Sequence, residues 1–552
     1  MGRLDVREGS AALLRRAADA DRRKDFAAAA QLAGKAAAVD PRNVEAWRIA
    51  GAFREKQGDL AGALEAYEQA LSLSPQDAGL ARAMARLASF LDIPALAEQF
   101  LLHARTLDPG SVEIANDLAV AWCAQMRFSD AVELLRESLT ANPGAALLWN
   151  TLGCVLFEQG QAGQSLVFFD EAIRLEPGMH TAHFNRANAR KAAGDIGGAL
   201  ADCERAIALG ADSPGQAAMY RYARALLLLN AGEIGAGWDA YAVRREEAYA
   251  EYVHHRLSGR EWKPGTPLAG KRLLVMGEQG LGDEVLFANV LPDVGRAIGD
   301  EGKLIVAVEP RLVSLFQRSF PAAQVLPYET RREDGRTIRA IPGLAAEDYD
   351  AWARMGDLLT DRRRSLGDFP NAAGFLKADS ARVAHWSALL DGFGPGPKVG
   401  VIWRSLLITS QRQKFYPPLE HWDALFRTPG VTFVNLQLGD CAGELRAIAQ
   451  ATGAAIRTLP SLDLRDDLDE IAALSLALDL VIGPATATTN IAAAVGAPTW
   501  FATTPDAWPR LGTAAFPWYP QARAFSGETG YDWAGVMAAI AEALAAEFGR
   551  KA

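Results

Sequence analysis

The chain has 552 residues, half of them apolar and 22% charged, which is the composition of a globular protein too long for a single hydrophobic core. Its formal net charge of -10 excludes a general electrostatic attraction to nucleic acid or to anionic membranes. The four cysteines are widely spaced and form no CxxC pair or Cys/His cluster. We therefore expect neither a disulfide framework nor a structural zinc.

The N-terminal segment has no apolar core of the signal-peptide kind. The longest apolar runs are interrupted by charge or glycine well before they could cross a membrane. From these two observations we expect a cytoplasmic protein without a membrane span.

A proline recurs every 34 residues in the first half of the chain, and small residues recur in the same phase wherever paired helices must approach closely. The prolines are Pro41, Pro75, Pro109, Pro143 and Pro177. This period is typical of the tetratricopeptide (TPR) family, whose members are α-helical solenoids. We predict a TPR array over residues 1–245, with five regular repeats and an irregular sixth near Pro214.

TPR solenoids resemble one another in offering a concave groove that receives an extended peptide or a helix. Three asparagines near the first helix of their repeats could hold a peptide backbone by their amides, namely Asn116, Asn150 and Asn185. Solvated asparagine on a helix face explains each of them equally well. An array that only dimerises the protein or braces the next domain is the alternative to groove binding.

A linker is predicted over residues 246–270, where prolines and glycines interrupt the pattern. A buried strand at 272–276, a glycine turn at 277–282 and a helix from Asp283 follow, with further strands at 303–308 and 324–327. This order brings backbone N–H groups toward a ligand in α/β folds. The glycines do not fit G-x-G-x-x-G, and no GK[ST] follows, so a dinucleotide fingerprint and a Walker loop are excluded.

The segment GEQGLGDEV resembles the opening of heptosyltransferase-type glycosyltransferases with the GT-B fold. In that family a G-x-GD turn, here Gly280 to Asp283 with Gly282 between, presents an aspartate at the cleft between two Rossmann-like lobes. The resemblance implies a GT-B domain after the TPR solenoid, with an acceptor-side N-terminal lobe at 271–390 and a nucleotide-sugar-side C-terminal lobe at 391–552. It also implies that Asp283 is the general base that takes a proton from the acceptor hydroxyl. The alternative is that Asp283 only caps the helix.

A strand at 398–403 opens the second predicted lobe, and the loop after it runs RSLLITSQRQKFYPP. By the same resemblance this loop faces the donor phosphate. Its candidate phosphate partners are Arg404, Arg412 and Lys414, with Arg404 preferred, and Tyr416 is the aromatic residue that the family often keeps in this loop. Gln437 ends the next strand at a carboxyl edge, where open α/β sheets bind ligands.

A hydrophobic strand at 478–482 leads into a threonine-rich turn and a helix that begins near residue 488. Polar side chains crowd this helix start, where unpaired N–H groups favour an anion: Thr486, Thr488, Thr489 and Asn490. The resemblance implies that the donor phosphate binds there, and ordinary N-capping by threonine is the alternative. The family commonly has an Asp–Ser/Thr pair where this chain has Pro484-Ala485-Thr486, which is compatible with a monophosphate leaving group.

Asp467 and Asp469 form a D-x-D, which binds a divalent ion in metal-dependent glycosyltransferases. Asp467 with Glu470 three residues later makes a better capping box at a helix start, so we expect no metal.

TPR arrays are joined to GT-B domains in nucleocytoplasmic O-GlcNAc transferases and in bacterial glycosyltransferases that modify flagellin, and the lobes here resemble the bacterial branch. The resemblance implies an inverting, metal-independent protein O-glycosyltransferase without a cofactor. Its TPR groove would recruit flagellin, and its donor would be a nucleotide-sugar such as CMP-pseudaminic or CMP-legionaminic acid. The alternatives are a transferase for envelope polysaccharide or lipid, and a non-catalytic TPR scaffold or chaperone with a degenerate transferase domain.

Overall fold

The computed structural model describes residues 9–333, 335–406, 410–459, 462–528 and 530–549. These residues form two compact units. The first comprises Met1–Gln159 with Val167–Pro177, and the second comprises Gly160–Leu166 with Gly178–Ala552.

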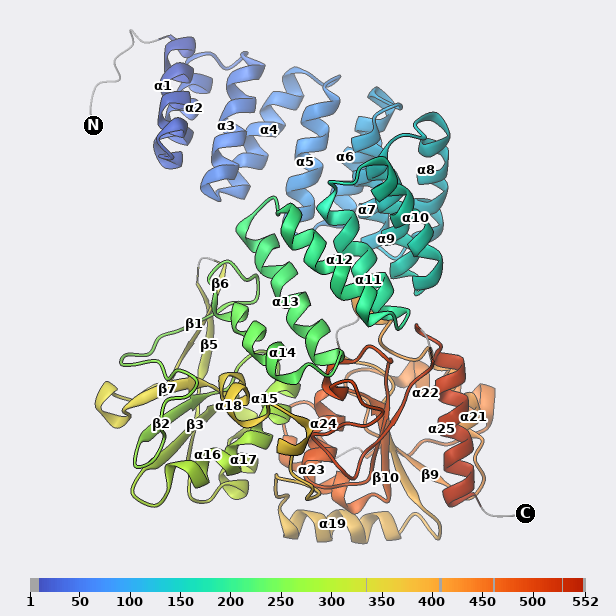
Figure 1. Cartoon of the computed structure of the whole chain (residues 1–552). Helices are drawn as coiled ribbons and strands as arrows, with labels where there is room; N and C mark the ends of the chain where they lie inside the picture. Colours follow the sequence, from blue (N-terminus) through green and yellow to red (C-terminus); the bar gives the residue numbers. More distant parts are fainter. Residues whose placement is uncertain (1–8, 334, 407–409, 460–461, 529, 550–552) are drawn as a thin grey trace. The chain divides into compact units, whose positions relative to one another are not determined.

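The first unit consists of helix pairs, coloured from blue to teal in Figure 1. They are α1 (Ser10–Arg22), α2 (Phe26–Val39), α3 (Val44–Gln57), α4 (Leu60–Leu73), α5 (Ala78–Phe90), α6 (Pro94–Leu107), α7 (Val112–Ala124), α8 (Phe128–Ala141), α9 (Ala146–Glu158) and part of α10 (Ala162–Leu175). A Cβ added to Gly51 would lie 2.7 Å from the Tyr67 ring, and one added to Gly153, three repeats later, 2.7 Å from the Phe169 ring. Close helix approach therefore explains the small residues, and the predicted helical repeat array is confirmed.

Four further helices belong to the second unit: α11 (His180–Ala192), α12 (Ile196–Leu209), α13 (Pro214–Asn230) and α14 (Ile234–Tyr241). They share a core with the α/β part through Trp238, which is 1% exposed. Its ring makes edge contacts with Phe287, Trp508 and Trp518, at centroid distances of 6.3, 5.9 and 6.2 Å. The last four helices of the array therefore belong to the same compact unit as the α/β part.

The first α/β sheet has the strand order β4-β3-β2-β7, and each neighbouring pair is parallel. Its strands are β2 (Arg272–Met276), β3 (Lys303–Val308), β4 (Gln324–Pro327) and β7 (Ala351–Arg354), with helices α15 (Leu281–Phe287), α16 (Leu291–Ile298), α17 (Val313–Ser319) and α18 (Leu359–Arg362). The predicted strands at 272–276, 303–308 and 324–327 are confirmed. A small separate sheet contains β1 (Val253–His255), β5 (Glu329–Glu333) and β6 (Arg336–Ala340).

The second α/β sheet has the order β12-β11-β10-β8-β9 and is also parallel throughout. Its strands are β8 (Lys398–Val401), β9 (Thr432–Asn435), β10 (Leu480–Pro484), β11 (Thr499–Ala502) and β12 (Arg523–Phe525). Its helices are α19 (Ser380–Asp391), α20 (Ser410–Gln413), α21 (Asp423–Phe426), α22 (Ala442–Thr452), α23 (Leu468–Ala477), α24 (Ala487–Ala494) and α25 (Trp533–Phe548). β8, β10 and β11 are buried along their whole length, as parallel strands covered on both faces are.

Two strand boundaries differ from the sequence prediction. β8 ends at Val401 rather than at residue 403, and β10 spans Leu480–Pro484 rather than 478–482. Leu478 still donates to the carbonyl of Leu474 at the end of α23, so the strand begins two residues later than the apolar run. Among the described residues, no helix is both long and apolar enough to span a membrane.

Candidate functional site

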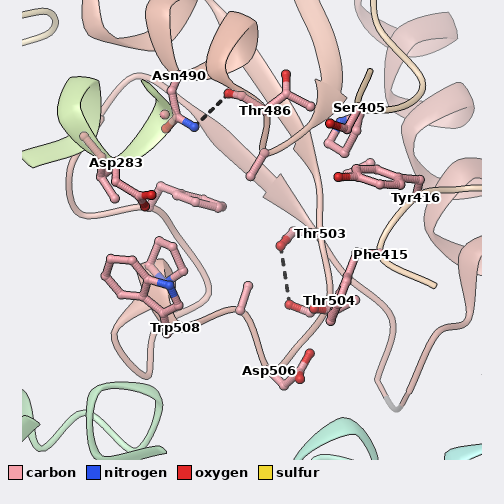
Figure 2. A pocket seen from close by; sticks show the side chains of 18 of the residues that line it. Asp283, Ser405, Phe415, Tyr416, Thr486, Asn490, Thr503, Thr504, Asp506 and Trp508 are labelled. Carbon is pink, nitrogen blue, oxygen red and sulfur yellow. Dashed lines mark hydrogen bonds between the residues drawn. The ribbon is translucent and has the colours of Figure 1, made fainter. Parts of the chain in front are cut away.

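A cavity of about 580 Å³ lies in the second unit, at the carboxyl edge of the second parallel sheet (Figure 2). The loops after β8, β10 and β11 line it, together with the first turns of α15 and α24. Helices α11 and α13 contribute Lys191 and Leu226. The cavity therefore collects residues from the second parallel sheet and its loops, from the helix that follows β2 of the first sheet, and from the last helices of the repeat array.

Asp283 lies in the first turn of α15 and lines this cavity. Its Oδ2 accepts a hydrogen bond of 3.1 Å from the Gly280 backbone N–H. Burial raises the pKa of Asp283 to about 6, although that hydrogen bond opposes the rise. Asp283 therefore caps the helix start while its carboxylate lines the cavity, and its role as a general base stays a prediction.

The glycine turn before Asp283 is held by side chains of β6 and α14. Arg339 of β6 donates to the carbonyls of Gly277 and Gln279, at 2.7 and 2.9 Å. The Tyr241 hydroxyl of α14 donates to Gln279 Oε1 at 2.9 Å. Gln279 has a φ of +59°, a left-handed conformation that is strained for a residue with a side chain. These contacts fix a turn that its own sequence does not favour.

A buried ion cluster anchors the same turn to the helical part of the second unit. A 3-10 turn, Ala242–Arg245, follows α14 and contains Arg244. The Arg244 guanidinium donates to both carboxylate oxygens of Glu278, at 2.9 and 2.8 Å. It also donates to Asp357 at 2.6 Å. All three side chains are at most 5% exposed. Since removing one partner of such a cluster leaves a buried charge, the cluster specifies where the turn sits.

The first turns of α15 and α24 lie against one another in the wall of the cavity. A Cβ added to Gly282 would lie 3.7 Å from Ala487 Cα and 3.7 Å from Asn490 Nδ2. Asn490 is itself held, because its Nδ2 donates to the Thr486 carbonyl at 2.8 Å and its Oδ1 accepts from the Tyr519 hydroxyl at 2.9 Å. The two 3.7 Å separations at Gly282 are ordinary van der Waals distances, so the two helix starts pack directly against each other.

The four polar residues at the start of α24 divide into two pairs. Thr486 and Asn490 line the cavity. Thr488 and Thr489 are 3% and 0% exposed, and Thr489 Oγ1 donates to the Pro484 carbonyl at 2.6 Å while accepting from the Thr486 N–H at 2.8 Å. The structure therefore brings Gly282, Asp283, Thr486 and Asn490 together, and gives Thr488 and Thr489 buried positions behind them.

Of the predicted residues in the loops after β8 and β9, Tyr416 lines the cavity, next to Arg412. Arg404 is instead bound in a two-point ion pair to Glu444, at 2.7 Å from each nitrogen. Lys414 lies with its ammonium 5.8 Å from the Phe415 ring centre.

Gln437 is 1% exposed and joins two loops, since its Oε1 accepts from the N–H groups of Trp403 and Arg404 at 3.1 and 3.0 Å. It lines a second cavity, of about 730 Å³, at the carboxyl end of β9.

Sequence reasoning did not assign the loop after β11, which brings Thr503, Thr504 and Asp506 to the cavity beside Trp508 (Figure 2). A signal was present, because β11 pairs in parallel with β10 and the loops after parallel neighbours meet at one edge. Lys191 carries no comparable signal, since it belongs to a repeat helix far away in the sequence.

The predicted groove residues lie in both units. Asn116 accepts from the Thr151 hydroxyl at 2.5 Å and donates to Asp117 at 2.9 Å, so it links two successive repeats. Asn150 is 7% exposed. Asn185 lies on α11, in the second unit.

The D-x-D aspartates are engaged by other side chains. Asp467 caps α23, accepting from the Glu470 N–H at 3.1 Å, and pairs with Arg382 at 3.0 Å. Asp469 pairs with Arg318 at 2.7 Å. The predicted capping role of Asp467 is confirmed.

Two family models described as tetratricopeptide repeat match residues 44–87 and 150–214. The chain is 45% identical over 532 residues to a protein of Caulobacter vibrioides named Protein FlbA, an alignment that covers 96% of this chain and 89% of the relative. It is also 48% identical over 52 residues to Tetratricopeptide repeat protein 36 of Bos taurus, covering 9% of this chain and 28% of that one.

Among solved structures, a tetratricopeptide repeat protein from Parabacteroides merdae is 15% identical with a TM-score of 0.34, covering 37% of this chain and 80% of that chain. PilW, described as a type IV pilus biogenesis factor, is 22% identical with a TM-score of 0.32, covering 36% of this chain and 92% of that chain.

Proposed function

The chain belongs to the same family as Protein FlbA, and from that premise we propose that it is an inverting protein O-glycosyltransferase with a GT-B domain. The observation that carries this proposal is a carboxylate, Asp283, with its pKa raised to about 6, in a cavity that also contains a helix start suited to an anion. The cavity lies at the carboxyl edge of the second parallel sheet and beside the helix that follows β2 of the first, and this arrangement supports two Rossmann-like lobes.

In the proposed reaction Asp283 accepts the proton of a serine or threonine hydroxyl as its oxygen attacks the anomeric carbon of the donor. The bond between that carbon and the phosphate oxygen breaks, and the leaving nucleotide keeps the electron pair. The N–H groups at the start of α24, with Arg412 at the cavity wall, stabilise the charge that develops on this phosphate.

We propose flagellin as the protein acceptor, recruited in the cytoplasm by the TPR array, and a CMP-linked nonulosonic acid as the donor. TPR repeats are protein-interaction modules, which supports a polypeptide acceptor. The start of α24 has Pro484-Ala485-Thr486 where the family commonly has an Asp–Ser/Thr pair, and this departure is compatible with a monophosphate leaving group such as CMP.

The test is to incubate the purified chain with flagellin and a CMP-linked nonulosonic acid, and to measure the intact mass of flagellin. We expect a mass increase with the wild-type chain and none with Asp283→Asn, which keeps the size of the side chain but cannot accept the proton. Asp130→Asn is the matched control, because Asp130 is also a carboxylate in the first turn of a helix, here α8, and lies in the first unit.

Each other outcome contradicts a specific part of the proposal. Transfer by Asp283→Asn at the wild-type rate would exclude Asp283 as the base. Transfer to saccharide or lipid, with flagellin unchanged, would favour the envelope transferase. Absence of donor binding and of transfer in the wild-type chain would favour a scaffold.

A further inference from the structure

The wall of the cavity contains a second carboxylate, Asp506, whose hydrogen-bonding capacity is largely unused (Figure 2). Its side chain is 2% exposed, and apart from an ion pair with Lys191 neither Oδ atom has a hydrogen-bonding partner among the described residues. An ionised carboxylate offers about four acceptor sites, and burying it without donors is unfavourable. The position therefore calls for donors from a bound molecule.

The cation beside Asp506 comes from the repeat array. Lys191 Nζ, at the end of α11, lies 3.1 Å from Asp506 Oδ2, and Lys191 also lines the cavity. An ammonium has three N–H donors, so this contact leaves others for a ligand. The pair thus offers the cavity an acceptor and a donor side by side with no net charge.

A hydroxyl group is the ligand chemistry that fits such a pair. It can donate to the carboxylate while accepting from the ammonium, whereas a second anion would be repelled by Asp506 and a second cation by Lys191. Two adjacent hydroxyls use both carboxylate oxygens. The aromatic rings of Trp508 and Phe415, which also line the cavity, supply apolar surface for the C–H groups of such a ligand.

We propose that Asp506 and Lys191 form a subsite for a vicinal diol of the bound nucleotide-sugar. This inference rests on the proposed function for the identity of the ligand. The diol belongs either to the ribose of the nucleotide or to the transferred sugar. Asp506 and Lys191 are specificity residues here and take no part in proton transfer.

Calorimetric titration of the full chain with two ligand pairs distinguishes these sources. The first pair is CMP and 2′,3′-dideoxy-CMP, and the second is CMP-N-acetylneuraminic acid and an analogue whose side chain lacks the vicinal hydroxyls. In the pair that carries the recognised diol, we expect the ligand with the diol to bind the wild-type chain about tenfold more tightly than the ligand without it. A preference in the first pair identifies the ribose, and a preference in the second identifies the transferred sugar. Asp506→Asn should reduce that preference to less than about threefold, without changing the affinity for the ligand that lacks the diol.

Two further variants control for damage to the fold. Asp202→Asn changes an aspartate of similar burial, 4% exposed, which pairs with Arg186 at 2.6 Å outside the cavity, and it should keep the preference for the diol. The double variant Asp506→Asn/Lys191→Met removes both charges of the pair together and should lose that preference too. Thermal unfolding without ligand shows whether each variant is folded.

The outcomes separate the subsite from the function on which it rests. If all four ligands bind but the wild-type chain prefers neither diol, the subsite is wrong while the nucleotide-sugar proposal stands. If Asp506→Asn weakens all four ligands equally, Asp506 has only a structural role. If none of the four binds the wild-type chain, the CMP-linked donor and the subsite are both wrong.

Discussion

Asp283 sets the pH range in which the cavity can take a proton from an acceptor. Burial raises its pKa to about 6, and only the ionised form is a base. As the pH falls through about 6 the carboxylate becomes protonated, so we expect kcat/KM for transfer to fall about tenfold per pH unit below about pH 5.5. The measurement is the transfer rate between pH 4.5 and 8 at low donor concentration.

The acid limb of the pH profile is the range in which kcat/KM falls with decreasing pH, and its position is the diagnostic result. A limb near pH 4, the ordinary range of aspartate, would mean that Asp283 is fully hydrated or is not the base. Tyr416→Phe is a suitable control, because it changes a cavity side chain without changing the carboxylate, and it should leave the limb where it is.

Local sequence predicted some of the cavity residues and missed others for a physical reason. Asp283, Thr486 and Asn490 follow a strand-turn-helix pattern, which is encoded within a few residues. Arg404 follows a strand as predicted, but Glu444, forty positions later, holds its guanidinium. Asp506 is in no motif, and its role depends on a lysine of a distant helix.

The turn that joins β2 to α15 requires a glycine at its first position. A Cβ on Gly277 would lie 2.5 Å from the carboxylate of Glu284, which is itself held by Tyr328 and by the Glu309 N–H at 3.0 Å. We expect Gly277→Ala to lower the free energy of unfolding by about 1–3 kcal/mol and to reduce transfer, because the turn must move. Urea unfolding and the transfer assay measure the two effects.

Gly295→Ala is the matched control for this substitution. Gly295 lies inside α16, where an added Cβ meets nothing within 4 Å. Alanine is the better helix former there, so this variant should gain about 0.5–1 kcal/mol of stability and keep its activity. If the two variants unfold alike, the close approach of Gly277 to Glu284 is not what constrains the turn.

The helices and strands themselves were largely predictable from the sequence, whereas the side-chain contacts that hold the glycine turn in place were not. Parallel strands of the first sheet have the bounds that their apolar runs indicate, because strands buried on both faces read as continuous apolar segments. The contacts that hold the glycine turn come from distant residues. Arg244 is 34 positions from Glu278, and Arg339 is 62 positions from Gly277, so no local sequence pattern specifies these partners.

The largest difference between sequence and structure concerns where the repeats stop being independent of the α/β part. The 34-residue period predicts one array to about residue 245, and that boundary stays a prediction. By packing, however, α11–α14 belong with the α/β part, because the core around Trp238 is shared. The 34-residue period indicates how helices pair within the array, but it does not indicate which other part of the chain packs against the last helices.

A shortened chain tests this division of labour at the scale of the molecule. Residues 110–552 lack α1–α6 but keep α7–α14 and every residue that lines the cavity. We expect this chain to keep the thermal stabilisation that the nucleotide-sugar gives the full chain, since a ligand raises apparent stability through its own site. Modification of flagellin should fall, while the slow hydrolysis of the donor by water should remain.

The comparison of the two readouts decides the outcome. Loss of donor stabilisation in a shortened chain that circular dichroism shows to be helical would mean that α1–α6 contribute to the donor site. Full modification of flagellin by the shortened chain would mean that the first repeats do not recruit the acceptor. If donor stabilisation is kept and flagellin modification is lost, recruitment belongs to the first repeats and chemistry to the second unit, with Lys191 as the repeat residue that contacts the substrate.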